Sequence, residues 1–246
     1  MQVTLVICIL SVVLFAGMIT RELLINKQSQ SFYENLATSA EAGRLEAPNQ
    51  NGTNNPDSSD LFVPFVDFEK LDMDFPGLVG WIKLPNSPID YPVMQHTDND
   101  YFLSRLPDGT RHRSGSIFLD YRNSSDFSDK SILIYGHESR EDEMFGSLKN
   151  YRNQKYFDEN PIIHLYTPER DYEIILFATY LAHSQDDHPP LSFRNNEEFL
   201  RYIGQITDKS LIKSDVTVNG DDQIVSLCTC AYDFDEARLV VVGVLK

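Results

Sequence analysis

The residues from Leu61 to Lys246 contain a series of short apolar segments, each rich in Ile, Val, Tyr, Phe or Leu and bounded by Pro, Asn, Asp or Gly. Residues of the first kind favour β-strands, and residues of the second kind favour turns. The predicted strands cover 79–83, 89–93, 115–120, 131–135, 162–166, 173–180, 223–230 and 239–245. Eight short strands joined by turns predict a mainly β domain that forms a closed or nearly closed barrel.

A few helices are expected around this barrel. The clearest is 195–206, in which Phe199, Leu200, Ile203 and Ile206 recur at helical spacing. Two shorter helices are predicted near 67–74 and 144–151. The domain at 61–246 is therefore predicted to be a β-barrel with peripheral helices.

The N-terminus carries a run from Val3 to Ile19 without a charged residue. Its 17 residues are at the short end of what crosses a bilayer, for which about 20 are typical, yet they exceed the roughly 7–15 residues of a signal-peptide core. We therefore favour a retained transmembrane anchor over residues 1–25. A cleaved signal peptide and a buried soluble helix are the alternatives.

The charges beside this run are at odds with the motifs described below. Arg21 and Lys27 both follow the apolar run, and the positive-inside rule would then keep the rest of the chain in the cytoplasm. What those motifs imply, as given below, is an extracellular domain. Two cations are a weak bias, so we expect the domain to be outside.

A connecting segment is predicted between the anchor and the barrel, over residues 26–60. Its first part is compatible with a helix, and residues 45–60 are rich in Asn, Pro, Gly and Ser without an apolar period. Such a composition is typical of a flexible tether.

The composition excludes one class of partner. The formal net charge of −16 argues against nucleic acid, which binds to basic patches. An acidic surface suits an amine or a basic peptide, although charge that only aids solubility is an equally good explanation. Three cysteines are too few for a disulfide framework, so a thiol with another purpose is expected.

The C-terminal block joins a thiol to a guanidinium. An apolar strand ends at Cys230, a polar loop follows, and Arg238 begins the last strand. If the two strands pair, both residues lie at the same end of a hairpin, where the cation favours the thiolate and can hold an oxyanion. A buried structural cysteine with a surface arginine is the alternative.

A histidine follows another apolar strand. Residues 132–135 lead to Gly136 and then His137, which places an imidazole at a strand exit, with glycine permitting close approach of the backbone. Taken alone, His137 is better explained as a surface histidine in a turn. The histidines at 96, 112, 164, 183 and 188 lack this setting, and none has a partner at metal-ligand spacing.

Together these motifs resemble the sortases, and class B sortases in particular. Residues 226–230 match the family signature TLxTC with Ser226 in place of the first Thr, and the Tyr-Gly-His order of 135–137 matches the segment of the catalytic histidine. Arg238 precedes a Val-rich strand, as the family's arginine does. Further similar stretches are 80–85, 89–93, 115–123 and the helix at 195–206.

The resemblance implies an eight-stranded sortase-type β-barrel, preceded by an N-terminal membrane anchor helix, on the outer face of a Gram-positive cell. The implied reaction is transpeptidation without a metal or organic cofactor. Cys230 would attack the Thr carbonyl of a C-terminal sorting signal on a surface protein, giving a thioacyl-enzyme. Arg238 would stabilise the oxyanion. His137 would transfer protons to the leaving amine and from an incoming amine of peptidoglycan precursor or cross-bridge.

The resemblance also suggests substrate contacts at Leu103, Ser184 and Thr229. Ser226 departs from the signature, and Ala231 stands where some relatives carry an acid, so any role of that acid is absent here. Two alternatives remain: a cysteine hydrolase that releases its acyl group to water, and a non-catalytic, membrane-anchored surface protein with a sortase-like barrel.

Overall fold

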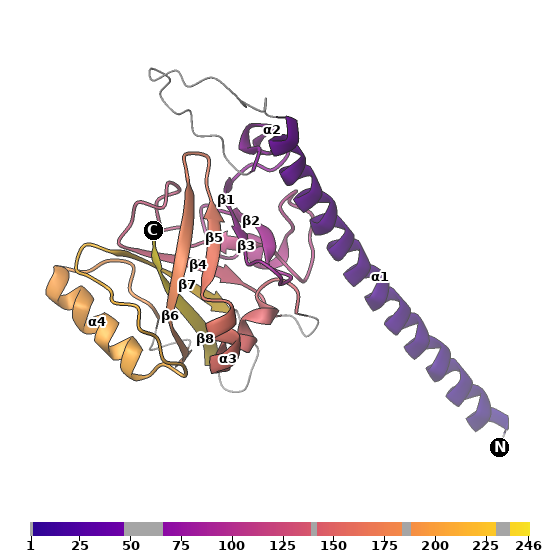
Figure 1. The fold of residues 1–246 in the computed structure, drawn as a ribbon. Coiled ribbons are helices and arrows are strands. Elements are labelled where there is room, and N and C mark those ends of the chain that lie inside the picture. The colour runs from indigo at the N-terminus through magenta and orange to yellow at the C-terminus, as the bar shows by residue number, and fades with distance from the viewer. Residues whose placement is uncertain (1, 47–65, 139–141, 184–187, 230–236) are drawn as a thin grey trace. The chain divides into compact units, whose positions relative to one another are not determined.

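The computed structural model describes residues 2–46, 66–138, 142–183, 188–229 and 237–246. The chain divides into two compact units, Met1–Thr38 and Ser39–Lys246. The first consists of helix α1 (Gln2–Glu46), the long indigo helix of Figure 1, which continues into the second unit. Side chains of α1 bond to the preceding turn, as where Thr38 Oγ1 donates to Glu34 O at 2.8 Å.

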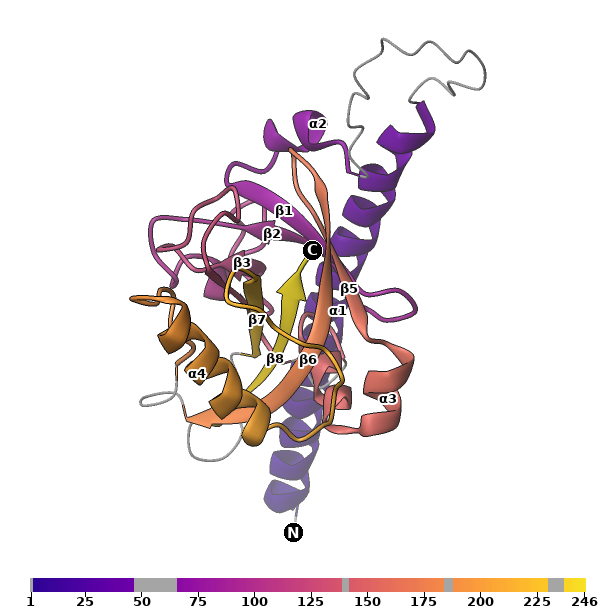
Figure 2. The ribbon, with the colours of Figure 1, turned by 60° about the vertical axis from the view of Figure 1, so that its left-hand side comes forward.

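The second unit is built around a closed barrel of eight strands, as Figures 1 and 2 show, and the predicted barrel is thereby confirmed. Its strands are β1 (Leu78–Lys83), β2 (Asp90–Met94), β3 (Ile117–Leu119), β4 (Ser131–Gly136), β5 (Ile162–Tyr166), β6 (Asp171–His183), β7 (Gln223–Thr229) and β8 (Ala237–Leu245). Their order around the barrel is β1-β2-β3-β4-β7-β8-β6-β5.

Two neighbouring pairs in this barrel are parallel. β2 runs parallel to β3, and β4 runs parallel to β7 over six residue pairs from Ser131↔Ile224 to Gly136↔Thr229. The other neighbours, including the long β6–β8 and β7–β8 pairs, are antiparallel. Because β4 and β7 run the same way, their C-terminal ends lie at one end of the barrel, where β8 begins. We call this end the barrel mouth, defined by Gly136, Thr229 and Arg238.

Large apolar side chains are buried on both faces of the barrel wall. Trp81, Ile82, Leu133, Val225 and Val241 are each at most 1% exposed. Full burial of side chains of this size stabilises a fold by about 1.5–3 kcal/mol each. The central strands β4 and β7 are buried along both faces, which explains why their sequences read as continuous apolar runs.

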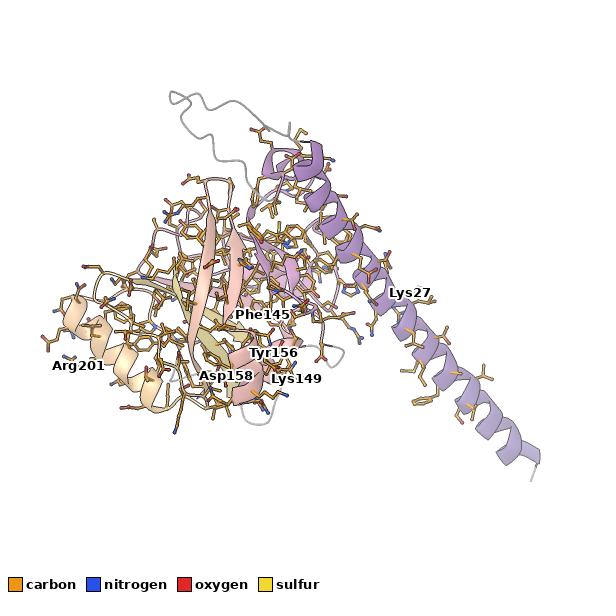
Figure 3. All side chains as sticks on the ribbon, viewed as in Figure 1. Lys27, Phe145, Lys149, Tyr156, Asp158 and Arg201 are labelled. Atoms are coloured by element: carbon orange, nitrogen blue, oxygen red, sulfur yellow. The ribbon has the colours of Figure 1, made fainter. Side chains whose placement is uncertain are left out.

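The helices of this unit begin at side chains that accept backbone hydrogen bonds. Asn195 caps α4 (Asn196–Asp208) by accepting from Glu198 N, and Asn153 caps α3 (Gln154–Glu159). Helix α4 buries Phe199, Ile203 and Ile206, while Arg201 projects from its outer face in Figure 3. The predicted helix at 195–206 is thus confirmed.

The other predicted helices differ in detail. The short helix expected at 67–74 is α2 (Phe68–Asp72). The helix expected at 144–151 is instead a 3₁₀ helix, η2 (Gly146–Arg152), which leads into α3. Lys149, Tyr156 and Asp158, labelled in Figure 3, lie on these two helices. A second 3₁₀ helix, η1 (Phe102–Ser104), precedes β3.

Among the residues that the structure describes, no helix has both the length and the apolar character that crossing a bilayer requires. Residues 3–10 of the predicted anchor fall outside those whose side chains are described. Further along α1, Val12, Val13, Leu14 and Phe15 are all more than 60% exposed.

Candidate active site

The barrel mouth is organised by the parallel pair β4–β7. Gly136 and Thr229 are register partners at its last step. In the sequence His137 directly follows Gly136, and Cys230 directly follows Thr229. Cys230 itself lies outside the described residues, so the structure gives the position of its neighbour and not of its thiol.

Gly136 occupies a place with no room for a side chain. A Cβ there would overlap Ile117 and come within 2.8 Å of the Phe145 ring. Phe145 is held next to the end of β4 because its backbone N–H donates a hydrogen bond to His137 O at 3.0 Å. The glycine before the histidine is therefore required by close packing, which is the role that its sequence setting indicates.

His137 is held by the backbone of η1. Its Nε2 lies 2.6 Å from Leu103 O, and its side chain is half-buried. A carbonyl oxygen only accepts, so Nε2 carries the proton. This contact orients the ring and makes Nε2 a donor.

Thr229 ties the end of β7 to the start of β8. Its Oγ1 accepts a hydrogen bond from Leu239 N at 3.0 Å and donates one to Leu239 O at 3.3 Å. The side chain is 1% exposed. Its hydroxyl is thus committed to the backbone of β8, and Arg238, one residue before Leu239, is placed at the same barrel end as His137.

Arg238 contacts a histidine that the sequence reasoning passed over. Arg238 Nη1 lies 3.3 Å from His188 Nε2. Burial of part of the His188 ring, followed by the charges of Arg238 and Arg122, lowers the pKa of this imidazole, and Asp120 opposes them. A neutral His188 is therefore favoured beside the guanidinium.

Asp120 is the centre of a hydrogen-bond network on the same side of the barrel. Its carboxylate is fully buried and accepts from Arg122 Nε at 2.9 Å, Arg122 Nη2 at 2.8 Å and Asn99 Nδ2 at 3.1 Å. Tyr135 Oη donates to it at 3.2 Å. Asn99 also accepts from Tyr121 N at 3.0 Å, so the segment that leads into η1 is fastened to the end of β3.

This network sets the ionisation of its members. Burial alone would raise the pKa of Asp120, but the hydrogen bonds from Arg122 and Asn99 hold it below the usual value of 3.8. Burial, the neighbouring Cys228 and Asp120 together raise the pKa of Tyr135 well above its usual range. At neutral pH the site therefore contains a carboxylate and a protonated phenol.

The described part of the site gathers some of the predicted residues. His137, Thr229, Arg238 and the Leu103 carbonyl meet at the barrel mouth. Cys230 and Ser184 lie outside the described residues. Asp120 and His188 were not singled out from the sequence. The signal for Asp120 was an acidic residue that ends a β-strand, followed two positions later by Arg122; His188 offered no local signal.

Known proteins resemble this chain closely. The family model described as the sortase domain matches residues 82–246. Sortase B of Listeria monocytogenes is 32% identical over 245 residues, covering 98% of this chain and 95% of the relative. The Staphylococcus aureus sortase B–substrate complex superposes with a TM-score of 0.78 at 29% identity, covering 91% of this chain and 98% of that one.

A further solved structure agrees in fold and extent. A crystal structure of sortase B complexed with triglycine has a TM-score of 0.78 and 28% identity, with coverage of 90% of this chain and 98% of the other. Family, sequence relative and structural neighbours thus coincide over the same barrel. The chain belongs to the sortase family, within its class B, and is a cysteine transpeptidase of that type.

Proposed function

We propose that this transpeptidase uses Cys230 as nucleophile, His137 for proton transfer and Arg238 for oxyanion stabilisation. The register at the barrel mouth is the observation that carries the proposal. Gly136 pairs with Thr229, and Thr229 is bonded to Leu239. The chain positions adjacent to these three residues are 137, 230 and 238, which are the positions that the reaction requires.

The reaction begins with attack on an amide. The Cys230 thiolate adds to the carbonyl carbon of Thr in a C-terminal sorting signal, and the carbonyl electrons move to oxygen. Arg238 donates hydrogen bonds to that oxyanion. The tetrahedral intermediate collapses, the C–N bond breaks, and the leaving amine takes a proton from His137. The thioacyl-enzyme and a neutral His137 remain.

The second half-reaction reverses the proton transfer. An incoming amine attacks the thioester while His137 accepts its proton, and the thiolate leaves. The Leu103 carbonyl supports both halves because its hydrogen bond with Nε2 holds the imidazole ring in one orientation. The net result is a new amide bond between the acyl group of the sorting signal and the incoming amine.

The proposed mechanism requires an acyl donor, an acceptor amine and a groove that binds the donor. We infer that the acyl donor is a surface protein with a C-terminal sorting signal and that the acceptor is an amine of peptidoglycan precursor or cross-bridge. The relatives solved with a substrate and with triglycine support this pair of reactants. Leu103, at the edge of the mouth, Ser184 and the backbone near Thr229 are proposed to line the substrate groove.

The proposed location is the outer face of a Gram-positive cell membrane. Residues 1–25 would form the anchor, 26–60 a connecting segment, and 61–246 the catalytic domain. The uncharged run from Val3 to Ile19 supports the anchor, as do the exposed apolar side chains at 12–15. A helix with apolar side chains on all sides is stabilised by lipid and not by water.

The central test is the formation of a new amide. The full chain in detergent is incubated with a library of sorting-signal peptides and triglycine, and the products are identified by mass spectrometry. We expect peptide joined to triglycine with the native chain and none with Cys230→Ala, because the thioacyl bond cannot form. Cys228→Ala, the same change two residues earlier, is the matched control and should retain activity.

The alternatives give different products. A hydrolase would release the cleaved peptide with a free carboxylate even when triglycine is abundant. A non-catalytic surface protein would show no product from any peptide, and Cys230→Ala would change nothing. A normal rate in Cys230→Ala would contradict the proposed nucleophile.

A further inference from the structure

The contact between Arg238 and His188 fixes the state of the imidazole. Arg238 Nη1 only donates, so His188 Nε2, 3.3 Å away, must offer its lone pair. The ring is therefore neutral and carries its proton on Nδ1. Arg238 pairs in register with Ala182 of β6, and His188 lies a few residues beyond the end of that strand. One partner thus lies at the start of β8, and the other follows β6, which is the neighbour of β8 in the barrel.

The charges around His188 agree with this state. Its ring contacts the guanidinium of Arg238 on β8. It also interacts electrostatically with Arg122 and Asp120, which follow β3. The two arginines, together with burial, outweigh the carboxylate of Asp120, and the pKa of His188 is lowered. A second proton on the ring would remove the acceptor and place a cation beside Arg238.

The carboxylate of Asp120 is already occupied by other donors. Both of its oxygens accept from Arg122, and Asn99 and Tyr135 take the remaining positions on Oδ2. Asp120 therefore neutralises Arg122 and not Arg238. A carboxylate bonded to Arg238 would also compete with the oxyanion for the same donors, whereas a neutral imidazole leaves the charge intact.

We propose that His188 is a positioning residue for Arg238: its neutral imidazole accepts one hydrogen bond from the guanidinium and holds the remaining donors toward the oxyanion. This inference rests on the proposed role of Arg238. An arginine side chain has several rotatable bonds, so an unheld guanidinium would sample positions in which it cannot reach the reacting oxygen. The bond to His188 restricts that sampling before substrate arrives.

The test compares variants that keep or remove the acceptor. In His188→Gln, the side-chain oxygen still accepts from Arg238 and does not titrate. His188→Leu retains volume without an acceptor. We expect His188→Leu to lower kcat about tenfold with little change in KM, since the loss is of transition-state stabilisation. His188→Gln should stay within about twofold of the native chain. His164→Gln, on β5, is the matched control and should be unchanged.

A pH profile separates positioning from packing. Between neutral and mildly acidic pH, the native chain should lose more activity than His188→Gln, because protonation of His188 removes its acceptor. The assay uses the full chain in detergent, triglycine, and an intact peptide from the library that the native chain cleaves. Thermal unfolding of each variant confirms that the fold is retained. Equal acid profiles for the two proteins would overturn the proposal.

A mutant cycle distinguishes this proposal from the proposed function. In an Arg238→Ala background, His188→Leu should cause less than about a further twofold loss, because the residue that it positions is gone. An undiminished effect of about tenfold in that background, or full activity of His188→Leu alone, would overturn the positioning role. Full activity of Arg238→Ala would instead show that the oxyanion assignment of Arg238 is wrong.

Discussion

Arg122 and Arg238 differ in how their charges are balanced. Arg122 is bound by the buried carboxylate of Asp120 through two nitrogens. Arg238 is bound by a neutral imidazole. One guanidinium is thus paired with a buried carboxylate, and the other keeps its full charge, which the proposed mechanism uses at the oxyanion. This difference leads to separate predictions for the two sites.

For Arg238 we predict that lysine cannot replace arginine. Arg238→Lys should reduce kcat by on the order of 10²–10³, because a single ammonium does not reproduce a planar set of donors that bonds His188 and the oxyanion together. Single-turnover kinetics with an intact substrate peptide from the library measure the acylation step directly. Arg201→Lys on the outer face of α4 is the control, and near-native acylation in Arg238→Lys would contradict the assignment.

For Asp120 we predict a loss of stability that depends on pH. Asp120→Asn should destabilise the fold by about 2 kcal/mol at neutral pH, since Arg122 loses its charged partner. The folded-state pKa of Asp120 lies below 3.8, so its contribution is fully present above that value and is lost as pH falls through the folded pKa. The difference between native chain and variant should therefore shrink in acid.

Urea unfolding at several pH values measures this difference. Asp208→Asn, at the exposed end of α4, provides the control and should have little effect at any pH. A stability difference that grows as pH falls toward 3.8 would contradict this, because it would mean that folding raises the pKa of Asp120 above that value.

At the scale of secondary structure, the strands were readable from the sequence, whereas their pairing was not. Segment 162–166 is β5 to the residue, and the others differ by a few residues at their ends, most of all β6, which begins earlier and ends later than predicted. β-branched and aromatic runs define a strand locally. The parallel pairing of β4 with β7 depends on the whole barrel, and the alternation along either strand cannot reveal it.

The helix predicted at 144–151 shows the limit of local periodicity. The apolar spacing there fits a helix, yet the segment forms a 3₁₀ turn and then α3. Phe145 and Leu148 are fully buried, and Asn153 caps the following helix. The segment has only a weak intrinsic preference for an α-helix. Burial against the barrel and the Asn153 cap, which begins a new helix, outweigh that preference.

For β4 we predict that its last residue must be glycine. Gly136→Ala should destabilise the fold by about 1–3 kcal/mol and lower activity, because the new methyl group displaces Ile117 or Phe145 and shifts the backbone that carries His137. Denaturant unfolding and a kcat measurement report the two effects.

Gly204 in the middle of α4 provides the matched comparison. A Cβ at Gly204 meets nothing within 4 Å. Gly204→Ala should therefore stabilise the chain by about 0.5–1 kcal/mol through helix propensity and leave activity unchanged. Equal effects of the two substitutions would contradict the close packing at Gly136.

At the scale of the whole molecule, the sequence motifs pointed to three positions, and the barrel brings the neighbours of these positions, Gly136, Thr229 and Leu239, to one end. The predictions for His137 and Arg238 came from strand exits and from the resemblance, and the strand ends do meet. His188 and Asp120 could not be found this way, because their importance comes from contacts with segments distant in the chain. A side chain whose role depends on tertiary neighbours has no local pattern.

The orientation of the chain in the membrane is open to a direct test. If the catalytic domain is outside, a protease added to intact cells should digest it, whereas a cytoplasmic marker stays intact. Lysed cells provide the control in which both are cleaved. Full protection of the domain in intact cells would show that the cations at Arg21 and Lys27 decide the orientation after all.

The pairing of Gly136 with Thr229 has a consequence for how competence is acquired. No single stretch of the chain contains the reactive centre, since its walls come from a hairpin at the C-terminus, a strand from the middle and a 3₁₀ turn that precedes both. Closing such long loops occurs late in folding. In a nascent or unfolded chain, Cys230 is an ordinary thiol. Transpeptidase activity is therefore expected only after the last strands of the barrel have paired.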